Sequence, residues 1–276
     1  MRILGYKLSL TAQIGIVIVL INLSVALFAP LIAPFDQATP LGDAWADADA
    51  QHWLGLDNLG RDILSRLIYG ARMSIGLALV ITALSFLIGV ISGFAAAVAG
   101  GWIDQLLSRF VDLLLSMPTL IFAFVILSAL GSALPVLVAT IAILDSTKVF
   151  RLARSVAVNI VSLEFVEAAR LRGEGWWWIV TREVLPNAIP PLTAEFGLRF
   201  CFTFLFIAAL SFLGLGVQPP GASLGSLLRQ GSAYLTFAPW LALSSGLVLS
   251  SAIMSVNLVG DAIRDILEPL YGRPLT

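Results

Sequence analysis

The sequence predicts an all-α integral membrane protein with about six transmembrane helices. Of its 276 residues, 59% are hydrophobic and only 12% are charged, whereas a soluble domain is closer to half apolar and a quarter charged. The mean hydropathy is +0.96. Long apolar runs recur along the chain, and an α-helix satisfies its own backbone hydrogen bonds in lipid. Much of the exterior must therefore face a membrane.

The first apolar run, residues 12–33, follows Arg2 and Lys7. It is nearer to the ~20 residues that cross a bilayer than to the ~7–15 of a secretory signal, so we expect an uncleaved anchor helix. Five further runs are expected to span the membrane: residues 74–99, 113–130, 134–150, 191–215 and 239–259. Gly89 and Gly93 form a G-x-x-x-G pattern in the second run, which suits close helix packing.

The orientation is predicted from basic residues, which favour cytoplasmic loops. The loop between the fourth and fifth runs is the richest in arginine, with Arg151, Arg154, Arg170, Arg172 and Arg182. If this loop is cytoplasmic, six spans place both termini in the cytoplasm and the segment before residue 74 outside. Within that segment, residues 62–71 are read as either an amphipathic helix on the outer membrane surface or an ordinary loop.

The chain therefore divides into three parts. Residues 1–73 hold the anchor helix and an external segment, residues 74–264 form the permeation core with a long cytoplasmic loop at 151–190, and residues 265–276 form a cytoplasmic tail.

The sequence lacks the features that several kinds of binding site require. The net charge of -1 does not favour nucleic acid, whose binding calls for a basic surface. One cysteine, Cys201, allows no intrachain disulfide, and one histidine, His52, argues against a histidine-cluster metal site. No G-x-x-x-x-G-K-[ST] phosphate loop is present. We expect no catalytic, metal or cofactor residues, an inert core role for Cys201, and a structural or solvated His52.

The long loop is predicted to hold two short helices, at residues 155–171 and 176–185, separated by Gly173 and Gly175. Tryptophans favour the headgroup level, so we expect the three consecutive tryptophans at 176–178 to hold the second helix at the inner interface. Three prolines are expected to punctuate the chain: Pro186 to end this helix, and Pro190 and Pro191 to begin the fifth span.

The end of the first loop helix carries the pattern expected of a coupling helix, which transmits the movement of a partner. Ala168 and Ala169 offer small side chains that let another backbone approach closely. Glu167 and Arg170 supply polar contacts, and Gly173 lets the chain turn sharply.

These residues resemble a known signature. Glu167-Ala168-Ala169, Gly173 and the Val-Leu-Pro-Asn of residues 184–187 are similar to the EAA motif of ABC importer permeases. Four more stretches, covering residues 52–62, 112–118, 211–220 and 257–265, resemble the C-type permease of dipeptide, oligopeptide and nickel importers. The resemblance extends over about residues 10–269, and five motifs in order make it specific.

The resemblance implies a type I ABC importer permease fold in the inner membrane. It implies a non-enzymatic subunit that forms half of the membrane path beside a second homologous permease. Two ATPase subunits would bind ATP and Mg²⁺, and an external binding protein would deliver the solute. Peptides are the first expectation, with nickel chelates or opine- and sugar-like solutes as alternatives.

Ionisable residues inside the expected spans are costly and usually face protein or water. Asp145 and Lys148 are three residues apart, and Glu195 and Arg199 are four apart, so each pair shares a helix face. Either both pairs neutralise themselves between helices, or Asp145 and Lys148 line the translocation pathway. Two other classes of function receive no support: a secondary transporter needs an internal repeat and a midplane ion site, and a membrane enzyme needs a catalytic constellation.

Overall fold

A computed structural model shows an elongated bundle of helices and describes residues 2–3, 6–7, 10–236 and 239–270. Its elements in chain order are β1 (Arg2–Ile3), β2 (Tyr6–Lys7), α1 (Leu10–Leu27), α2 (Ala29–Ile32), α3 (Ile63–Ala99), α4 (Gly101–Leu115), α5 (Thr119–Leu130), α6 (Leu134–Val161), α7 (Glu164–Leu171), α8 (Trp176–Trp178), the π-helix η1 (Ile179–Val184), α9 (Leu185–Phe212), α10 (Leu224–Ala233) and α11 (Pro239–Leu270).

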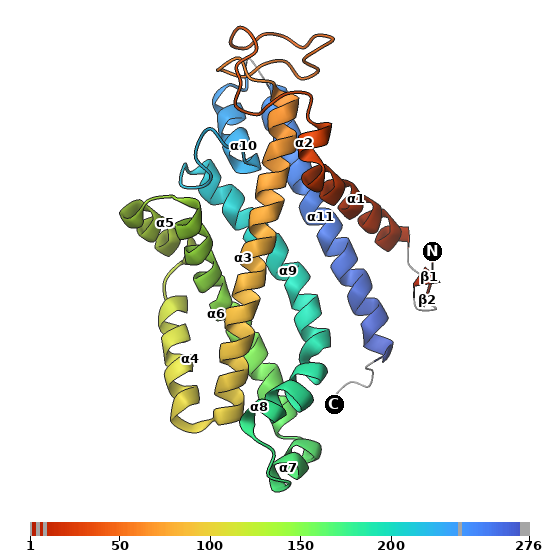
Figure 1. Ribbon diagram of the computed structural model, residues 1–276, viewed down its shortest axis with the longest axis vertical. Helices are drawn as coiled ribbons and strands as arrows, with labels where there is room; N and C mark the ends of the chain where they lie inside the picture. Colours follow the sequence, from red (N-terminus) through yellow and green to blue (C-terminus); the bar gives the residue numbers. More distant parts are fainter. Residues whose placement is uncertain (1, 4–5, 8–9, 237–238, 271–276) are drawn as a thin grey trace.

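The long helix α3 forms the axis of the molecule (Figure 1). Its 37 residues extend about 55 Å at 1.5 Å per residue. The Asp62 side chain caps its first turn by accepting a hydrogen bond from the Ser65 backbone N–H, at 2.7 Å. Along its length α3 packs against α6 and α9, and also touches α1, α4 and α11.

The predicted role of the G-x-x-x-G pattern is confirmed by the contact between α3 and α6. A Cβ added at Gly89 would lie 2.6 Å from the Cβ of Val149. One added at Gly93 would lie 2.8 Å from the backbone oxygen of Phe150. Both distances are shorter than a van der Waals contact, so the absence of a side chain at these two glycines sets how closely the helices approach.

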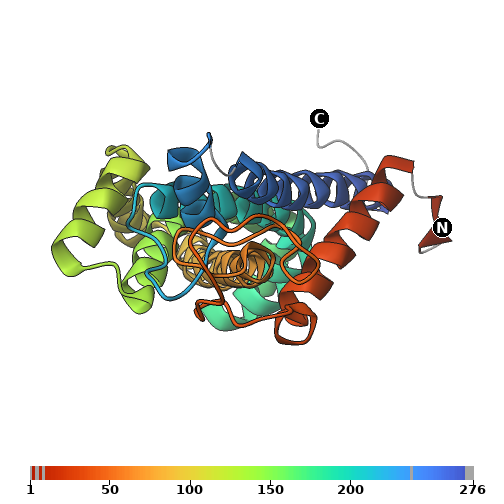
Figure 2. The ribbon, with the colours of Figure 1, turned by 90° about the horizontal axis from the view of Figure 1, so that it is seen from above.

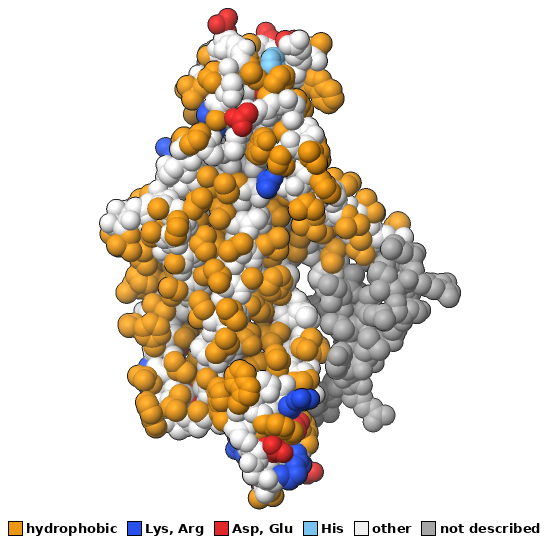
Figure 3. All heavy atoms as spheres, in the orientation of Figure 1, with side chains coloured by type: hydrophobic (Ala, Val, Ile, Leu, Met, Phe, Trp, Pro, Cys, Tyr) orange, Lys and Arg blue, Asp and Glu red, His pale blue; other side chains and the backbone are white. Residues whose placement is uncertain are grey.

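Apolar side chains cover the middle of the molecule, and charged ones gather mostly at its two ends (Figure 3). Three helices are long and apolar enough to cross a membrane, namely 63–99, 176–212 and 239–260, and the bent pair α4–α5 makes a fourth if it is one span. Each of the six predicted runs lies on a helix or a helix pair, so the all-α membrane fold is confirmed while the count of six remains approximate.

Both sequence interpretations of residues 62–71 are wrong. The stretch is neither a separate surface helix nor a loop, because Ile63 begins α3 and the helix continues without a break to Ala99. Ile63, Leu67 and Ile68 are buried. The helical spacing of these apolar residues was real, but they pack against protein rather than against lipid.

The predicted third span is broken. Residues 113–115 end α4, and α5 begins at Thr119 with its axis bent by 85° from that of α4. Pro118 lacks a backbone N–H and disfavours helical backbone at the residue before it, which explains the break. Helix α4, which the sequence analysis did not predict, is tied to α6 by the forked pair of Asp104 with Arg154.

The predicted helices of the long loop have different boundaries. Helix α6 continues to Val161, so α7 starts only at Glu164. Residues 176–212 form one continuous helix. Contrary to the sequence analysis, the helix is therefore neither ended by Pro186 nor begun by Pro190 and Pro191. The π-turn of η1 accommodates Pro186: the Leu185 N–H bonds to the carbonyl of Val180, five residues back, which widens the helix just before the proline.

Seen from above, α1 and the α4–α5 pair lie at opposite ends of the molecule, with α3, α9 and α11 between them (Figure 2). Helix α1 packs mainly against α11 and also contacts α3. Residues 33–62 form a loop cap over the start of α3, beside α10 (Figure 1). The predicted tail begins as helix, since α11 runs to Leu270, and residues 271–276 lie outside the described residues.

Candidate functional site

Helix α7 lies at the end of the molecule farthest from the loop cap (Figure 1). Val166 and Ala169 are fully buried and hold it against α6 and η1. Glu167, Ala168 and Arg170 are exposed. The two alanines thus do not form one outward face: Ala169 packs inward, and Ala168 is the small residue that is open to a partner.

The turn after α7 has the geometry predicted for Gly173. Its φ of +84° lies in the left-handed region that favours glycine. The Gly173 N–H bonds to the carbonyl of Arg170 at 2.9 Å, and the Glu174 N–H bonds to that of Ala169 at 3.2 Å. These two bonds form a Schellman motif, which satisfies the last carbonyls of the helix and ends it sharply.

The surface around α7 is unusually apolar for the end of a helix outside the bundle. Leu171 is 84% exposed, and Leu163 and Phe165 are each 41% exposed. Trp177 is 69% exposed on the adjoining α8. Apolar side chains grouped among charged ones on a protruding helix are typical of a protein interaction site.

The ion pair predicted between Asp145 and Lys148 is present, with 3.3 Å between Oδ1 and Nζ. The Asp145 side chain is 8% exposed and that of Lys148 is 36% exposed. The second predicted pair, Glu195 with Arg199, is also present. Sequence reasoning treated these pairs as separate, whereas the structure joins them across α6 and α9.

Two contacts make that connection. The Arg199 Nη1 lies 3.8 Å from the Asp145 Oδ1, and the Thr203 hydroxyl donates a hydrogen bond to the Asp145 Oδ2 at 3.2 Å. The spacing of Arg199 and Thr203, four residues apart on one helix, was a signal for this contact that sequence reasoning missed. Asp145 and Lys148 also line a small cavity of about 80 Å³ between α5, α6 and α9.

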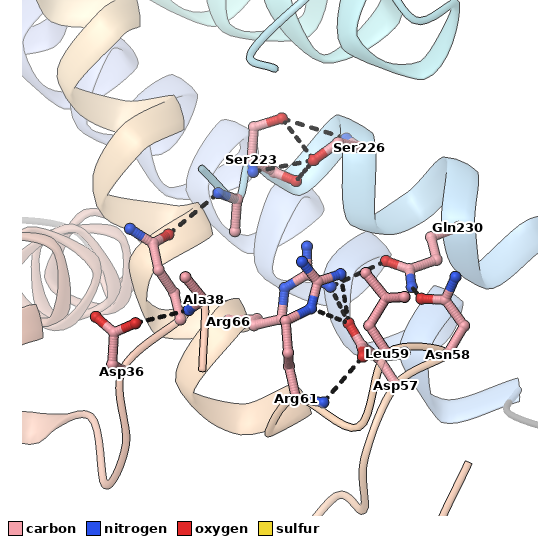
Figure 4. A network of polar contacts seen from close by, with 12 residues as sticks. Asp36, Ala38, Asp57, Asn58, Leu59, Arg61, Arg66, Ser223, Ser226 and Gln230 are labelled. Carbon is pink, nitrogen blue, oxygen red and sulfur yellow. Dashed lines mark hydrogen bonds and ion pairs between the residues drawn. The ribbon is translucent and has the colours of Figure 1, made fainter. Parts of the chain in front are cut away.

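At the opposite end, a polar network holds the loop cap to α3 and α10 (Figure 4). Arg61 donates from Nε to the Asp57 carboxylate at 2.9 Å, and Arg66 donates to the same oxygen. Arg66 also donates to Gln230 on α10 at 3.2 Å, and Gln230 donates to Asn58. Asp57 is fully buried, so the network is part of the interior of the cap.

The sequence analysis did not predict this network. Burial raises the pKa of Asp57, but hydrogen bonds from Arg61 and the charge of Arg66 outweigh it and hold that pKa below its usual value. The four-residue spacing of Asp57 and Arg61 was a usable signal. The contact of the cap with α10 could not be predicted from spacing, because Gln230 lies far away along the chain.

His52 has a structural role, which was one of the two predicted alternatives, the other being a solvated side chain. Its Nδ1 lies 3.1 Å from the Asp62 carboxylate, and its side chain is 12% exposed. Cys201 is buried, with its thiol 3.7 Å from the backbone oxygen of Ile253. Within the described part of the chain, no group of three or more His, Cys, Asp or Glu residues is arranged to hold a metal ion.

An apolar helical bundle with helices long enough to cross a membrane, and with charged groups gathered mostly at its two ends (Figure 3), defines an integral membrane protein. The family model for the binding-protein-dependent transport system inner membrane component matches residues 85–273. The chain belongs to this family. It is therefore an inner-membrane permease component of the ABC importer type, as the sequence analysis predicted.

Relatives with assigned transport systems align over nearly the whole chain. The dipeptide transport system permease protein DppC of Haemophilus influenzae is 33% identical over 271 residues, which covers 96% of this chain and 92% of the relative. The di/tripeptide transport system permease protein DppC of Pseudomonas aeruginosa is 38% identical, covering 92% and 86%. The glutathione transport system permease protein GsiD of Pectobacterium atrosepticum is 31% identical, covering 91% and 84%.

A solved structure of an amino acid ABC transporter with histidines has a similar fold. The TM-score is 0.53 at 18% sequence identity, and the match covers 75% of this chain and 94% of the other. At that identity the likeness establishes the fold alone, which agrees with the predicted permease architecture.

Proposed function

We propose that this chain forms half of the membrane pathway of an ATP-driven importer of peptides, beside a second homologous permease. Two ATPase subunits that hold ATP and Mg²⁺ dock at the α7 end, and an external binding protein delivers the solute at the loop-cap end. The peptide assignment is supported by the names of the dipeptide and di/tripeptide relatives. Nickel chelates and opine- or sugar-like solutes remain the alternative cargo.

This proposal depends mainly on how α7 is anchored to the bundle and exposed at its end. The helix is anchored by Val166 and Ala169, ends in a sharp turn at Gly173, and exposes Glu167 and the apolar Leu171. An anchored helix with an unpartnered outer face moves as one unit with the bundle behind it. A partner that grips this face can thus push or pull on α6 and η1, which α7 contacts.

The same proposal sets the orientation and the domains. The α7 end faces the cytoplasm, together with the start of α1 and the end of α11, which both point away from the loop cap (Figure 1). Residues 1–73 act as anchor and external cap, residues 74–264 as the permease core with its coupling loop at 151–190, and residues 265–276 as a cytoplasmic tail.

For the two charged residues of the core, we propose that Asp145 is a structural tie and that Lys148 faces the pathway. Asp145 is almost completely buried and has partners on two helices, whereas Lys148 is a third exposed and has Asp145 as its only ion-pair partner among the described residues. The alternative, in which both residues contact the solute, predicts that Asp145→Asn alone abolishes uptake without loss of assembly.

The test of coupling is the double variant Glu167→Lys/Gly173→Pro, produced together with the ATPase subunits. The charge reversal changes the exposed face, and proline at a φ of +84° cannot keep the turn. We expect normal membrane insertion but loss of co-purifying ATPase and of ATP-driven uptake. The matched control is Asp47→Lys, a charge reversal at an exposed residue of the loop cap, which should keep the ATPase bound. Wild-type uptake by the double variant would disprove the proposal.

A further inference from the structure

A cavity of about 500 Å³ opens at the loop-cap end, between the cap, the end of α9 and α10. Arg61 and Arg66 line it from the cap and α3, and Arg229 lines it from α10. Asn58, Gln218 and Gln230 add amide groups, and the described lining residues include no aspartate or glutamate. The charged residues of this lining are therefore all cationic, which favours an anionic ligand.

The charges around the cavity do not balance. Arg61 and Arg66 both pair with the single carboxylate of Asp57. The guanidinium of Arg229 has no hydrogen bond or ion pair with any other described residue, and it lies so close to Gly214 that an added Cβ there would collide with it. Three positive charges thus face one negative charge. Arg61 and Arg66 are buried and share one carboxylate, and Arg229 is exposed at the edge of the cavity, where its donors are free to bind an anion.

Two unpartnered polar atoms belong to residues that line the same cavity. Arg66 Nε and Ser211 Oγ are buried and have no hydrogen-bond partner, and both residues line the cavity. Arg66 is 5% exposed and Ser211 is 2% exposed. Since the great majority of buried polar groups in proteins have a partner, two orphans at one arginine-lined cavity require an explanation.

We propose that this cavity is a carboxylate-binding site. A guanidinium presents a planar fork of donors that matches a carboxylate in two parallel hydrogen bonds. The carboxylate can come from the delivered solute, since every unmodified peptide carries one, or from an acidic side chain of a protein that docks on the cap. The inference rests on the proposed function for its orientation, because only an outward-facing cap meets either source.

The probe is succinate, titrated by calorimetry against the full chain in nanodiscs, with succinamide as its uncharged counterpart. We expect succinate to bind and succinamide not to bind. Arg229→Gln should weaken succinate binding about tenfold, the order expected for loss of one charge-assisted hydrogen bond. Because the Arg229 side chain is exposed and has no polar partner among the described residues, this variant should fold normally, and its thermal unfolding is measured as a check.

The matched control is Arg72→Gln, an exposed arginine on α3 outside the cavity, which should bind succinate as the wild type does. Equal binding of succinate and succinamide, or unchanged binding by Arg229→Gln, would overturn the proposal. Tighter binding of inorganic phosphate than of succinate would overturn the assignment to carboxylates.

Two further measurements identify the source. If the carboxylate belongs to the binding protein, succinate should compete with the association of that protein. If it belongs to the solute, the wild type should import trialanine better than trialanine amide, and Arg229→Gln should lose this preference. Absence of both effects would overturn both sources. Succinate binding needs no ATPase, so Glu167→Lys/Gly173→Pro should bind succinate normally, which separates this site from the coupling proposal.

Discussion

The carboxylate of Asp145 on α6 lies 3.8 Å from the guanidinium of Arg199 on α9, and it also accepts a hydrogen bond from Thr203. Two helices that are distant in sequence are thus joined by one buried charge. Lys148 completes the group from the same helix as Asp145. The consequences of removing each member can therefore be distinguished.

Asp145→Ala should lower the free energy of unfolding by about 3 kcal/mol, because it leaves the mostly buried Arg199 with Glu195 alone and strands Lys148. Lys148→Gln should cost less than about 1 kcal/mol, since its side chain is more exposed. Both values are obtained from unfolding of the purified chain in mixed micelles.

The double variant Asp145→Asn/Lys148→Gln separates the structural role from the pathway role. Asparagine keeps an acceptor for Thr203, so the double variant should regain most of the stability that Asp145→Ala loses. Assembly and uptake are scored together. A double variant that assembles fully yet no longer transports would show that Lys148, alone or with Asp145, acts on the solute. Asp145→Asn alone decides between the two, because it should keep uptake if Asp145 is only a structural tie.

The two helices α3 and α6 should separate if a side chain is placed between them. Gly93→Ala puts a methyl group 2.8 Å from the Phe150 carbonyl oxygen, which should cost about 1–3 kcal/mol through overpacking. Gly76 is the control, because an added Cβ meets nothing within 4 Å. Gly76→Ala should be neutral or stabilising by up to about 1 kcal/mol. Equal thermal shifts for the two variants would contradict this account of packing.

The loop cap should loosen in acid. Because the folded-state pKa of Asp57 is lowered, its ionised form contributes stability that is fully present above the unfolded value near 3.8 and is lost as the pH falls below it. Pepsin, which is active in acid, should cleave residues 41–61 only in that range. Asp57→Asn should be cleaved at every pH tested, and Asp43→Asn, at an exposed position, should behave as the wild type.

The orientation can be tested with cysteine labelling, since Cys201 is buried. Asp47→Cys should react with an impermeant maleimide in intact cells, and Ala168→Cys should react only after the inner membrane is opened. Both positions are exposed in the fold. A reporter fused after Thr276 should likewise behave as cytoplasmic. Labelling of Ala168→Cys from outside would reverse the proposed topology.

The elements that the sequence predicted well are those in which one local property decides the outcome. Apolar runs identified the positions of the spans, glycine spacing identified a face of α3 that packs closely against another helix, and Gly173 identified the end of α7. Each of these depends on residues that are close together in the chain.

What the sequence did not predict depends on contacts between distant segments. Ile63 and Leu67 have the same helical spacing whether they meet lipid or protein, so pattern alone could not tell a surface helix from the start of α3. The pairing of Asp145 with Arg199 and of Arg66 with Gln230 requires knowing which helices are neighbours. The three prolines misled because the π-turn before Pro186 lets the helix continue.

Those prolines have a mechanical consequence. Pro186, Pro190 and Pro191 each remove one backbone donor from the stretch that links the α7 region to the membrane part of α9. A helix bends most easily where its backbone hydrogen bonds are missing. We expect a displacement of α7 to change the tilt of α9 by bending the chain at these prolines. Helix α3 has no proline, so it should stay straight while α9 tilts relative to it.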